Sequence, residues 1–344
     1  MGRITNRIWI AALSCALTLG TALPPATAAT AASQQTAKSK AVKAAKKAPA
    51  RKVTAKAKPK AKARAKVTAK AGVATHIRHA SFTPQEEIER VPGKLSLRSN
   101  VAFVQDLESS DVLVAKNDDA VLPIASITKL MTALVVVDAN LPLDEEIEVT
   151  NEDIDTLKHT SSRLVVGTRL SRRDMLHLAL MSSENRAASA LGRNYPGGLP
   201  AFVQAMNAKA ALLGMHDTHY VEPTGLSSSN VSSPRDLVRL MQVAVQRPLI
   251  HEFTTASSYT VPVRGRLQTF RTTNQLVAKP DWDIALSKTG FINEAGRCLI
   301  MLAKIGGRDL AIVLLDGMGS LTRTADAIRI RQWLQHHGGT MASM

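Results

Sequence analysis

The chain has 344 residues, 45% of them hydrophobic, and a formal net charge of +16. The charge is uneven: 17 of the 44 basic residues precede residue 79, and the rest of the chain holds 27 basic against 28 acidic residues. A uniformly basic fold is therefore excluded. Of the two cysteines, Cys15 lies in an apolar N-terminal run, which leaves Cys298 without a partner for an internal disulfide. About 250 residues remain to form a core, and that number is adequate without cross-links.

The N-terminus has the pattern of a secretory signal peptide. Arg3 and Arg7 precede an uncharged, largely apolar run, Ile8–Leu23, and Ala26–Ala28 supplies small residues for cleavage. The run is shorter than the roughly 20 residues that span a bilayer as a helix. We therefore predict a cleaved signal peptide, residues 1–28, and a periplasmic protein. An uncleaved membrane anchor is the alternative.

Residues 29–80 form a basic leader that is rich in Lys and Ala and has almost no large apolar side chain. Such a segment cannot bury enough surface to offset the entropy of ordering, so we expect it to be disordered. Its charge fits a tether to an anionic envelope polymer or lipid, and equally a solvated spacer without a defined partner. Nucleic acid is not expected, because the signal peptide directs export and the leader has no aromatic residue to stack on bases.

The rest of the chain predicts strands at both ends and helices in the middle. The predicted strands are Val101–Leu107 with Val112–Ala115, Asp283–Ser287, and Leu299–Lys304 with Leu310–Leu315. The predicted helices are one that begins directly after Ser126, Asp174–Leu180, Ala187–Leu191, Leu199–Leu213, Pro234–Val245 and Thr322–His336. This order predicts an α/β (α+β) fold with one antiparallel sheet flanked by helices and a helical lobe. We assign it to one domain, residues 81–338, followed by a flexible tail, 339–344.

Ser126 and Lys129 stand in the pattern Ser-Ile-Thr-Lys at the start of a predicted helix. Unpaired N–H groups and the dipole at a helix N-terminus favour negative charge, including a developing oxyanion. Lys129 lies one turn further on the same face, and burial near another cation can lower its pKa enough to accept the serine proton. Taken alone, the pair is better explained as an N-cap serine and a solvated lysine.

Ser183 and Asn185 flank Glu184 in a short polar break after the apolar run Leu176–Met181. Alternate residues of an extended or turn segment can point into one cleft. The hydroxyl can then relay a proton to a leaving amine, while the amide holds Lys129 and a substrate backbone. On this motif alone, a helix-capping loop is the favoured alternative.

Lys288, Thr289 and Gly290 follow an apolar strand. Gly290 allows a ligand to approach the backbone closely. A strand edge beside the serine can pair with an extended peptide, and Lys288 then attracts the carboxylate of that peptide. The backbone N–H of Phe291, together with that of Ser126, is a candidate oxyanion hole.

In this order, the three motifs match the S-x-x-K, S-x-N and K-T-G set of penicillin-interacting acyl-transfer enzymes. The stretches Pro123–Thr132, Leu180–Ala188 and Leu286–Arg297 resemble the low-molecular-mass penicillin-binding proteins, the D-alanyl-D-alanine peptidases. The resemblance covers about residues 96–338. The forms Ser-Glu-Asn-Arg-Ala and Lys-Thr-Gly-Phe-Ile-Asn-Glu-Ala-Gly-Arg look most like the endopeptidase branch of that family, the penicillin-binding protein 7 type.

This resemblance implies a β-lactamase/DD-peptidase-like fold and hydrolysis of D-alanyl–diaminopimelate cross-links between peptidoglycan stem peptides. It also implies inhibition by β-lactam antibiotics through a penicilloyl adduct, and no cofactor or metal ion. The roles that it implies are nucleophile for Ser126, general base for Lys129, proton relay for Ser183, orienting amide for Asn185 and carboxylate binder for Lys288. Two alternatives stay open: a carboxypeptidase with the same residues, and a non-enzymatic envelope-binding protein that acts through its leader.

Two further features are not assigned to chemistry. Glu222–Leu226 invites comparison with the deacylating glutamate loop of class A β-lactamases, but its leucine comes one place late and Ser227 replaces the asparagine. We interpret it as the Asp/Asn-Pro-x-Gly-Leu loop of the peptidase family. His216 and His219 lack a third ligand at a recognisable spacing, so we expect surface histidines rather than a metal site.

Overall fold

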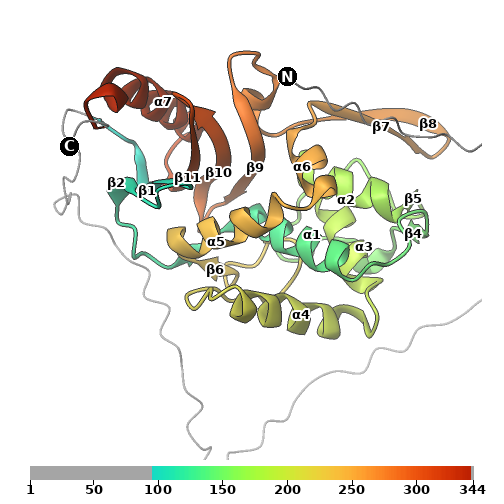
Figure 1. Ribbon diagram of the computed structural model, residues 1–344. Coiled ribbons are helices and arrows are strands. Elements are labelled where there is room, and N and C mark those ends of the chain that lie inside the picture. Colours follow the sequence, from blue (N-terminus) through green and yellow to red (C-terminus); the bar gives the residue numbers. More distant parts are fainter. Residues whose placement is uncertain (1–94, 342–344) are drawn as a thin grey trace, which may run out of the picture. The chain divides into compact units, whose positions relative to one another are not determined.

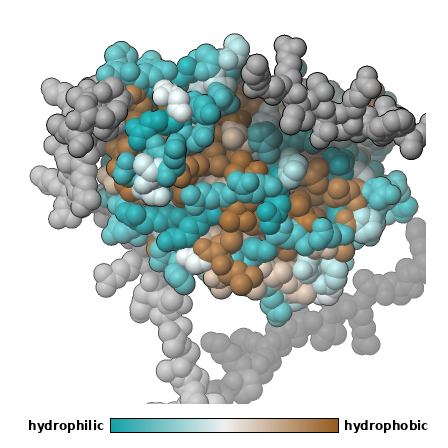
Figure 2. All heavy atoms as spheres, in the orientation of Figure 1, coloured by the Kyte–Doolittle hydropathy of each residue, from teal (hydrophilic) through white to brown (hydrophobic). Residues whose placement is uncertain are grey.

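A computed structural model of the chain describes residues 95–341, which form a sheet and a helical lobe (Figure 1). The predicted signal peptide, the basic leader and residues 342–344 lie outside the described residues. In the same view, the surface is a mixture of hydrophilic and apolar areas (Figure 2). None of the helices among the described residues is both long and apolar enough to span a bilayer.

The sheet joins strands from the two ends of the described chain. In spatial order its five antiparallel strands are β2 (Val112–Lys116), β1 (Ser99–Asp106), β11 (Arg308–Gly317), β10 (Gly296–Ile305) and β9 (Asp283–Ile292). In the central pair, Phe103 lies opposite Val313. β9 is an edge strand, and the backbone groups on its outer side have no strand partner.

Each face of the sheet has its own apolar core, because side chains alternate along a strand. On one face, Val104 shares a core with Trp333 of α7 (Thr322–Met341). On the other face, Phe103 and Val313 belong to a larger core that includes the helical lobe. The five-stranded sheet therefore lies between the last helix, α7, and the helical lobe.

The helical lobe is built around one buried helix. Its helices are α1 (Thr128–Asp138), α2 (Arg172–Met181), α3 (Asn185–Arg193), α4 (Gly198–Leu212), α5 (Pro234–Ala244) and α6 (Pro248–Thr255). In α1, every residue from Thr128 to Val136 is buried. Local sequence sets the start of two neighbours: Ser171 caps α2 by accepting from the N–H of Asp174, and Ser233 caps α5 with Pro234 at the first position.

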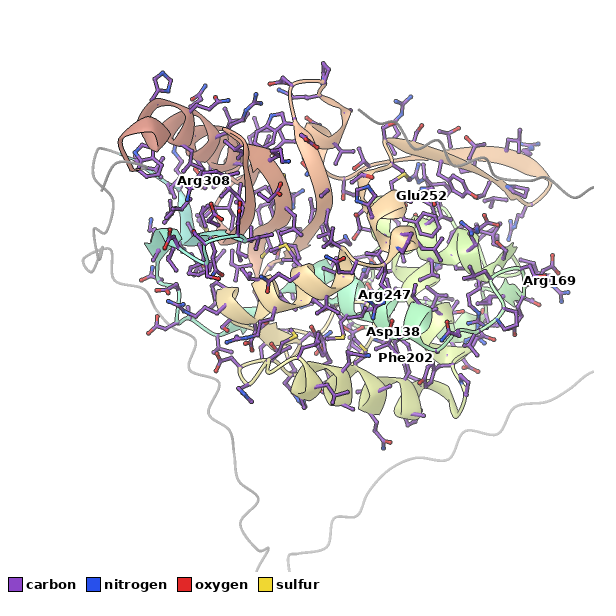
Figure 3. The ribbon with its side chains drawn as sticks, viewed as in Figure 1. Asp138, Arg169, Phe202, Arg247, Glu252 and Arg308 are labelled. Atoms are coloured by element: carbon purple, nitrogen blue, oxygen red, sulfur yellow. The ribbon has the colours of Figure 1, made fainter. Side chains whose placement is uncertain are left out.

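The carboxylate of Asp138 ties the C-terminal end of α1 to its neighbours (Figure 3). Its oxygens accept hydrogen bonds from Nε of Arg247 and Nζ of Lys209, each at 2.8 Å. Burial alone raises the pKa of Asp138, but the hydrogen bonds and charges of these two cations outweigh it and hold the pKa below its usual value. The helix that carries Lys129 near its first turn is therefore also fixed at its far end.

The predicted antiparallel sheet, its two hairpins and the flanking helices are confirmed, and the last helix continues past His336 to Met341. Sequence reasoning missed α6, the hairpin of β7 (Ser258–Val263) with β8 (Arg266–Arg271), and two short pairs, β3 (Leu122–Pro123) with β6 (Val231–Ser232) and β4 (Glu146–Glu148) with β5 (Arg169–Ser171). The short strands are too brief to show a periodic pattern. The β7–β8 turn escaped notice because Arg264 occupies a position where Asn or Gly is usual.

Candidate active site

The structure brings the three motifs together from separate elements. Nζ of Lys129 lies 2.9 Å from Oγ of Ser126 and 2.7 Å from Oδ1 of Asn185. Nζ of Lys288 lies 2.9 Å from Oγ of Ser183. The fold thus joins residues that are 56 and 105 positions apart in the chain, and the two lysines each contact a serine hydroxyl.

Ser126 lies in a 3-10 turn, Ala125–Ile127, that runs directly into α1, as its predicted place at a helix N-terminus requires. Ala125 has a φ of +48°, a conformation that costs an L-residue roughly 1–2 kcal/mol. Neighbouring loops support this strained turn at very close range. A Cβ on Gly225 would stand 1.9 Å from the carbonyl oxygen of Ala125, and one on Gly290 would stand 3.2 Å from the nitrogen of Ser126. At Gly290 the space that a side chain would occupy is filled by the serine turn, so the glycine is needed for this packing, and approach of a ligand to its backbone stays a prediction.

Lys129 is fully buried, and its nitrogen has a third partner in the carbonyl oxygen of Thr224, at 2.6 Å. Burial lowers the pKa of this lysine to about 8, against an opposing effect of the carboxylates of Glu222, Glu184 and Asp155. A lysine with this pKa has a substantial neutral fraction near neutral pH. It can therefore accept a proton from the serine and release it again, which is what a general base must do.

Glu222 shapes the loop that supplies this carbonyl group. Its carboxylate accepts hydrogen bonds from the N–H groups of Thr224 and Gly225, both at 2.6 Å, and from Nδ2 of Asn230 at 3.0 Å. The same asparagine donates to Oγ1 of Thr128 at 3.1 Å, at the start of α1. The carboxylate of Glu222, which we compared with the glutamate of a β-lactamase loop, is thus hydrogen-bonded within its own loop. The same loop places the carbonyl oxygen of Thr224 beside Lys129.

Ser183 and Asn185 occupy the break between α2 and α3. Ser183 has a φ of +61°, and Asn185 is the first residue of α3. Oδ1 of Asn185 faces the buried lysine, and its Nδ2 donates to Oγ1 of Thr160 at 3.0 Å. Between them, Glu184 is buried and accepts a hydrogen bond from Oγ of Ser162 at 2.6 Å. Both ends of the asparagine amide are therefore held before a substrate arrives.

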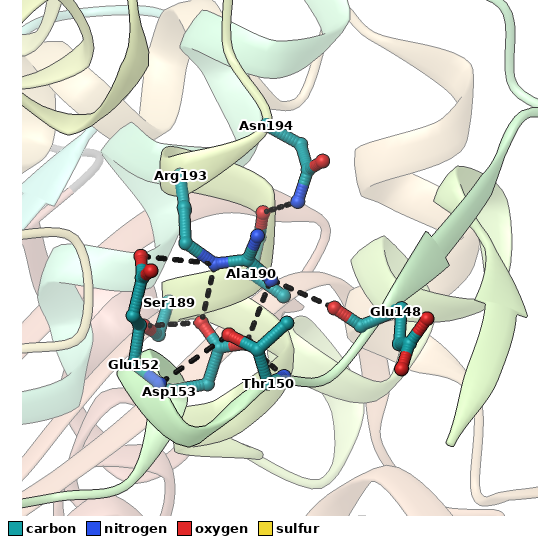
Figure 4. Close-up of polar contacts among 8 residues, drawn as sticks. All are labelled: Glu148, Thr150, Glu152, Asp153, Ser189, Ala190, Arg193 and Asn194. Atoms are coloured by element: carbon teal, nitrogen blue, oxygen red, sulfur yellow. Dashed lines mark hydrogen bonds and ion pairs between the residues drawn. The ribbon is translucent and has the colours of Figure 1, made fainter. Parts of the chain in front are cut away.

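The segment that carries Thr160 is anchored on α3 by a buried carboxylate (Figure 4). Asp153 accepts from Nη2 of Arg193 at 2.9 Å and from Oγ of Ser189 at 2.8 Å. Two residues later, Asp155 accepts from the N–H and the hydroxyl of Thr160, at 2.9 and 2.7 Å. Because α3 also begins with the site asparagine, one helix fixes both the amide and the hydroxyl that orients it.

Lys288 and Thr289 lie within β9 and are almost fully buried. Burial lowers the pKa of Lys288 well below its usual value, and the charges of Lys129 and Arg323 lower it further. Arg323 comes from α7 and donates to the carbonyl oxygen of Gly290 at 3.0 Å. An anionic group beside Lys288 would relieve this repulsion, so the environment suits a carboxylate.

Thr289 and Phe291, the residue that follows the third motif, extend the site along β9. Oγ1 of Thr289 is hydrogen-bonded to Oγ1 of Thr273 at 2.6 Å. Phe291 is half exposed, and the guanidinium of Arg297 lies 4.2 Å from the centre of its ring. The role of the Phe291 N–H in an oxyanion hole stays a prediction.

Sequence reasoning missed the supporting residues, which are Thr160, Thr224, Thr273 and Arg323. Each acts through a hydroxyl, a backbone carbonyl or a guanidinium that the fold brings in from a distant segment. The one available signal was the Pro-x-Gly-Leu loop, which marks the neighbourhood of Thr224. Among residues 95–341, no group of three or more His, Cys, Asp or Glu side chains could hold a metal ion.

Comparisons with known proteins place the chain in a family. The profile of peptidase family S11, described as D-alanyl-D-alanine carboxypeptidase, matches residues 86–319. A D-alanyl-D-alanine endopeptidase of Pseudomonas aeruginosa is 51% identical over 247 residues, which cover 71% of this chain and 80% of that protein. One of Escherichia coli is 47% identical over 248 residues, which cover 70% of this chain and 78% of that protein.

A solved structure with a similar fold is the Streptomyces K15 DD-transpeptidase. Its TM-score is 0.65 at 27% identity, and the match covers 70% of this chain and 98% of that one. The predicted DD-peptidase-like fold is therefore confirmed. Since the family profile spans more than half of the chain, this protein belongs to the D-alanyl-D-alanine carboxypeptidase family of peptidases, family S11.

Proposed function

We propose that this protein is a serine DD-peptidase that hydrolyses D-alanyl peptide bonds of peptidoglycan, with cross-links as the preferred substrate. The observation that carries the proposal is the contact of the buried Lys129 with Oγ of Ser126 at 2.9 Å, because it pairs a nucleophile with a base of suitable pKa. Residues 81–338 are the proposed catalytic domain.

Acylation begins with attack of Oγ of Ser126 on the carbonyl carbon of the D-alanyl residue. Lys129 accepts the hydroxyl proton as the new C–O bond forms, and the carbonyl oxygen becomes an oxyanion. The N–H groups of Ser126 and Phe291 are the proposed donors to that oxyanion. Asn185 holds the lysine and the substrate backbone in place.

The leaving amine must receive a proton as the C–N bond breaks. Ser183 is the proposed relay, since its hydroxyl lies beside Lys288 and its neighbour Asn185 contacts Lys129. Lys288 and Thr289 bind the carboxylate of the departing residue. Water then attacks the acyl-enzyme, Lys129 takes the proton of that water, and the C–Oγ bond breaks to regenerate Ser126.

Preference for cross-links is supported by the two relatives described above, both of which are named endopeptidases. A carboxypeptidase is the second candidate, favoured by the description of the family profile. Penicillin would acylate Ser126 in either case, because its β-lactam carbonyl takes the place of the D-alanyl carbonyl.

We also propose export to the periplasm through a cleaved signal peptide, residues 1–28. The support is the sequence pattern of this segment, together with a cell-wall substrate that lies outside the cytoplasmic membrane. For residues 29–80 we propose an electrostatic tether to an anionic envelope component.

The test is a product analysis by mass spectrometry of the mature protein and its Ser126→Ala variant. Each is incubated with cross-linked muropeptide dimers and with a pentapeptide that ends in D-Ala-D-Ala. We expect the wild type to convert dimers into monomers, and the variant to lose both turnover and penicillin labelling. Release of D-alanine with dimers untouched would establish the carboxypeptidase instead. Turnover that survives in the variant would refute the role of Ser126.

A further inference from the structure

The β7–β8 hairpin concentrates positive charge in a part of the chain that is otherwise near neutral. The segment 256–280 contains Arg264, Arg266, Arg271 and Lys279 and no Asp or Glu. The three arginines are exposed, and none of them forms an ion pair with any residue of the described part of the chain. Unbalanced charge on a rigid element attracts an anion.

Two of these arginines line a hollow at the end of the hairpin. It has a volume of about 410 Å³ and is lined by Val165, Val263, Arg264, Arg266 and Gln268. Arg264 has a φ of +50°, in a turn that usually has Asn or Gly. Two guanidinium groups and an amide at one hollow suit carboxylate oxygens, which accept hydrogen bonds from both kinds of donor.

The hollow is connected to the motif residues by two walls. The hairpin is the first: just after β8, Thr273 contacts the hydroxyl of Thr289, and its N–H donates to the carbonyl of Met181, two residues before Ser183. The segment from Thr160 to Val165 is the second, and it spans at most about 18 Å. The first wall starts near the groups that we assign to the departing amine and its carboxylate, and the second starts at Thr160, which accepts a hydrogen bond from Asn185.

A single residue joins the two walls along their length. The guanidinium of Arg163 lies 4.0 Å from the centre of the Phe270 ring, and its Nη1 donates to the carbonyl of Thr269 at 3.1 Å. Tyr259 of β7 ties the hairpin to α2 by donating a hydrogen bond to Oδ1 of Asp174 at 2.5 Å. The hollow therefore lies where the end of the hairpin meets the end of the Thr160–Val165 segment.

The chemistry of the cross-link supplies an acidic peptide on the departing side. When a carboxypeptidase acts, the departing group is free D-alanine, whose one carboxylate is assigned to Lys288. When a cross-link is cut, the departing amine belongs to a second stem peptide, which carries additional free carboxylates. We propose that the hollow lined by Arg264 and Arg266 binds a carboxylate of this departing stem peptide and so favours cross-links as substrates. The proposal rests on the DD-peptidase function proposed above.

The test compares three double variants of the mature protein. Arg264→Gln with Arg266→Gln removes the hollow's charges, and Arg264→Lys with Arg266→Lys keeps them. Arg271→Gln with Lys279→Gln removes two charges from the same segment outside the lining of the hollow. Each variant is assayed for dimer cleavage, for D-alanine release from a pentapeptide, and for the rate of penicillin acylation.

We expect the first variant to lose about tenfold in kcat/KM on dimers, mainly through KM, with D-alanine release and penicillin acylation within about twofold of the wild type. The lysine variant and the Arg271/Lys279 variant should stay close to the wild type. Product inhibition by the released tetrapeptide should weaken in parallel in the first variant, and high salt should reduce the difference between variants.

Equal loss in the first and third variants would overturn the proposal, because bulk charge would then explain the effect. Unchanged dimer cleavage in the first variant would also overturn it, and loss of binding to anionic phosphatidylglycerol vesicles in that variant would then assign the arginines to a lipid surface. A wild type that releases D-alanine but cleaves no dimers would instead refute the proposed endopeptidase, and this proposal with it.

Discussion

The two buried lysines of the site, Lys129 and Lys288, have the same side chain and almost the same burial, yet different surroundings. Each lies 2.9 Å from a serine hydroxyl, that of Ser126 or that of Ser183. Three carboxylates raise the pKa of Lys129 against the effect of burial and leave it at about 8. Around Lys288 the charges are those of Lys129 and Arg323, which add to the effect of burial.

This difference shows how one site can give two buried lysines different properties. Carboxylates keep the first lysine within reach of protonation at neutral pH, so that it can take a proton from its serine and give it back. Cations push the second toward its neutral form until an anion arrives. Burial alone would treat both alike, so the charged neighbours set the two lysines apart, in line with the roles proposed for them: proton exchange for Lys129 and carboxylate binding for Lys288.

Replacing Lys129 by Met should have the largest effect, because it removes the proposed base and keeps most of the buried volume. We expect the rate of penicillin acylation to fall about 10³-fold or more, as for loss of a general base. Stopped-flow acylation measurements at several pH values would check this. A residual rate above a tenth of the wild-type rate would contradict the proposed role, provided that thermal unfolding shows a folded variant.

Replacing Lys288 by Met should lower kcat/KM about 10- to 100-fold for substrates that carry a carboxylate. A sharper test uses proton uptake. Because the pKa of Lys288 is lowered in the free site, a bound carboxylate should raise it, so binding should take up a proton and weaken as the pH rises. Calorimetry of the Ser126→Ala variant with a D-Ala-D-Ala peptide, in two buffers of different ionisation enthalpy, measures that uptake. Uptake that persists when Lys288 is also Met would refute this origin.

The contrast between the two lysines could only partly be predicted from the sequence. The motifs identify Ser126, Lys129 and Lys288 because each motif is a short run of neighbouring residues, which can be recognised in the sequence without the fold. Apolar periodicity is also local in the chain, and it predicted the other helices of the lobe, the last helix and two of the hairpins, but not α6 or the β7–β8 hairpin. The carboxylates and cations that separate the lysines come from remote segments: Glu222 is 93 positions after Lys129, and Arg323 is 35 after Lys288. Only the folded chain reveals which charges meet.

Glu222→Gln tests the carboxylate side of the comparison. Loss of this negative charge should lower the pKa of Lys129, so the rising limb of the acylation rate against pH should move to lower pH. At a pH below 8, the rate relative to its own maximum should therefore be about threefold higher than in the wild type. The variant also loses loop hydrogen bonds, which lowers the absolute rate and thermal stability. Only the pH at which the acylation rate rises measures the effect of the Glu222 charge on Lys129. If that pH does not change in the variant, Glu222 acts through the geometry of its loop alone.

The smallest predicted effects come from a matched pair of threonines, one in each half of the site. Thr160 donates to Asp155 and orients Asn185 beside Lys129, whereas Thr273 contacts Thr289 next to Lys288. Each Thr→Val change removes one hydroxyl and its hydrogen bonds, worth about 0.5–1.5 kcal/mol, so a two- to tenfold loss is expected. If the two halves divide the work as proposed, Thr160→Val should slow acylation by penicillin and peptides alike, whereas Thr273→Val should act mainly on KM for carboxylate-bearing peptides. The same kcat and KM changes in both variants would mean that the halves act as one network, and the division between the lysines would have to be abandoned.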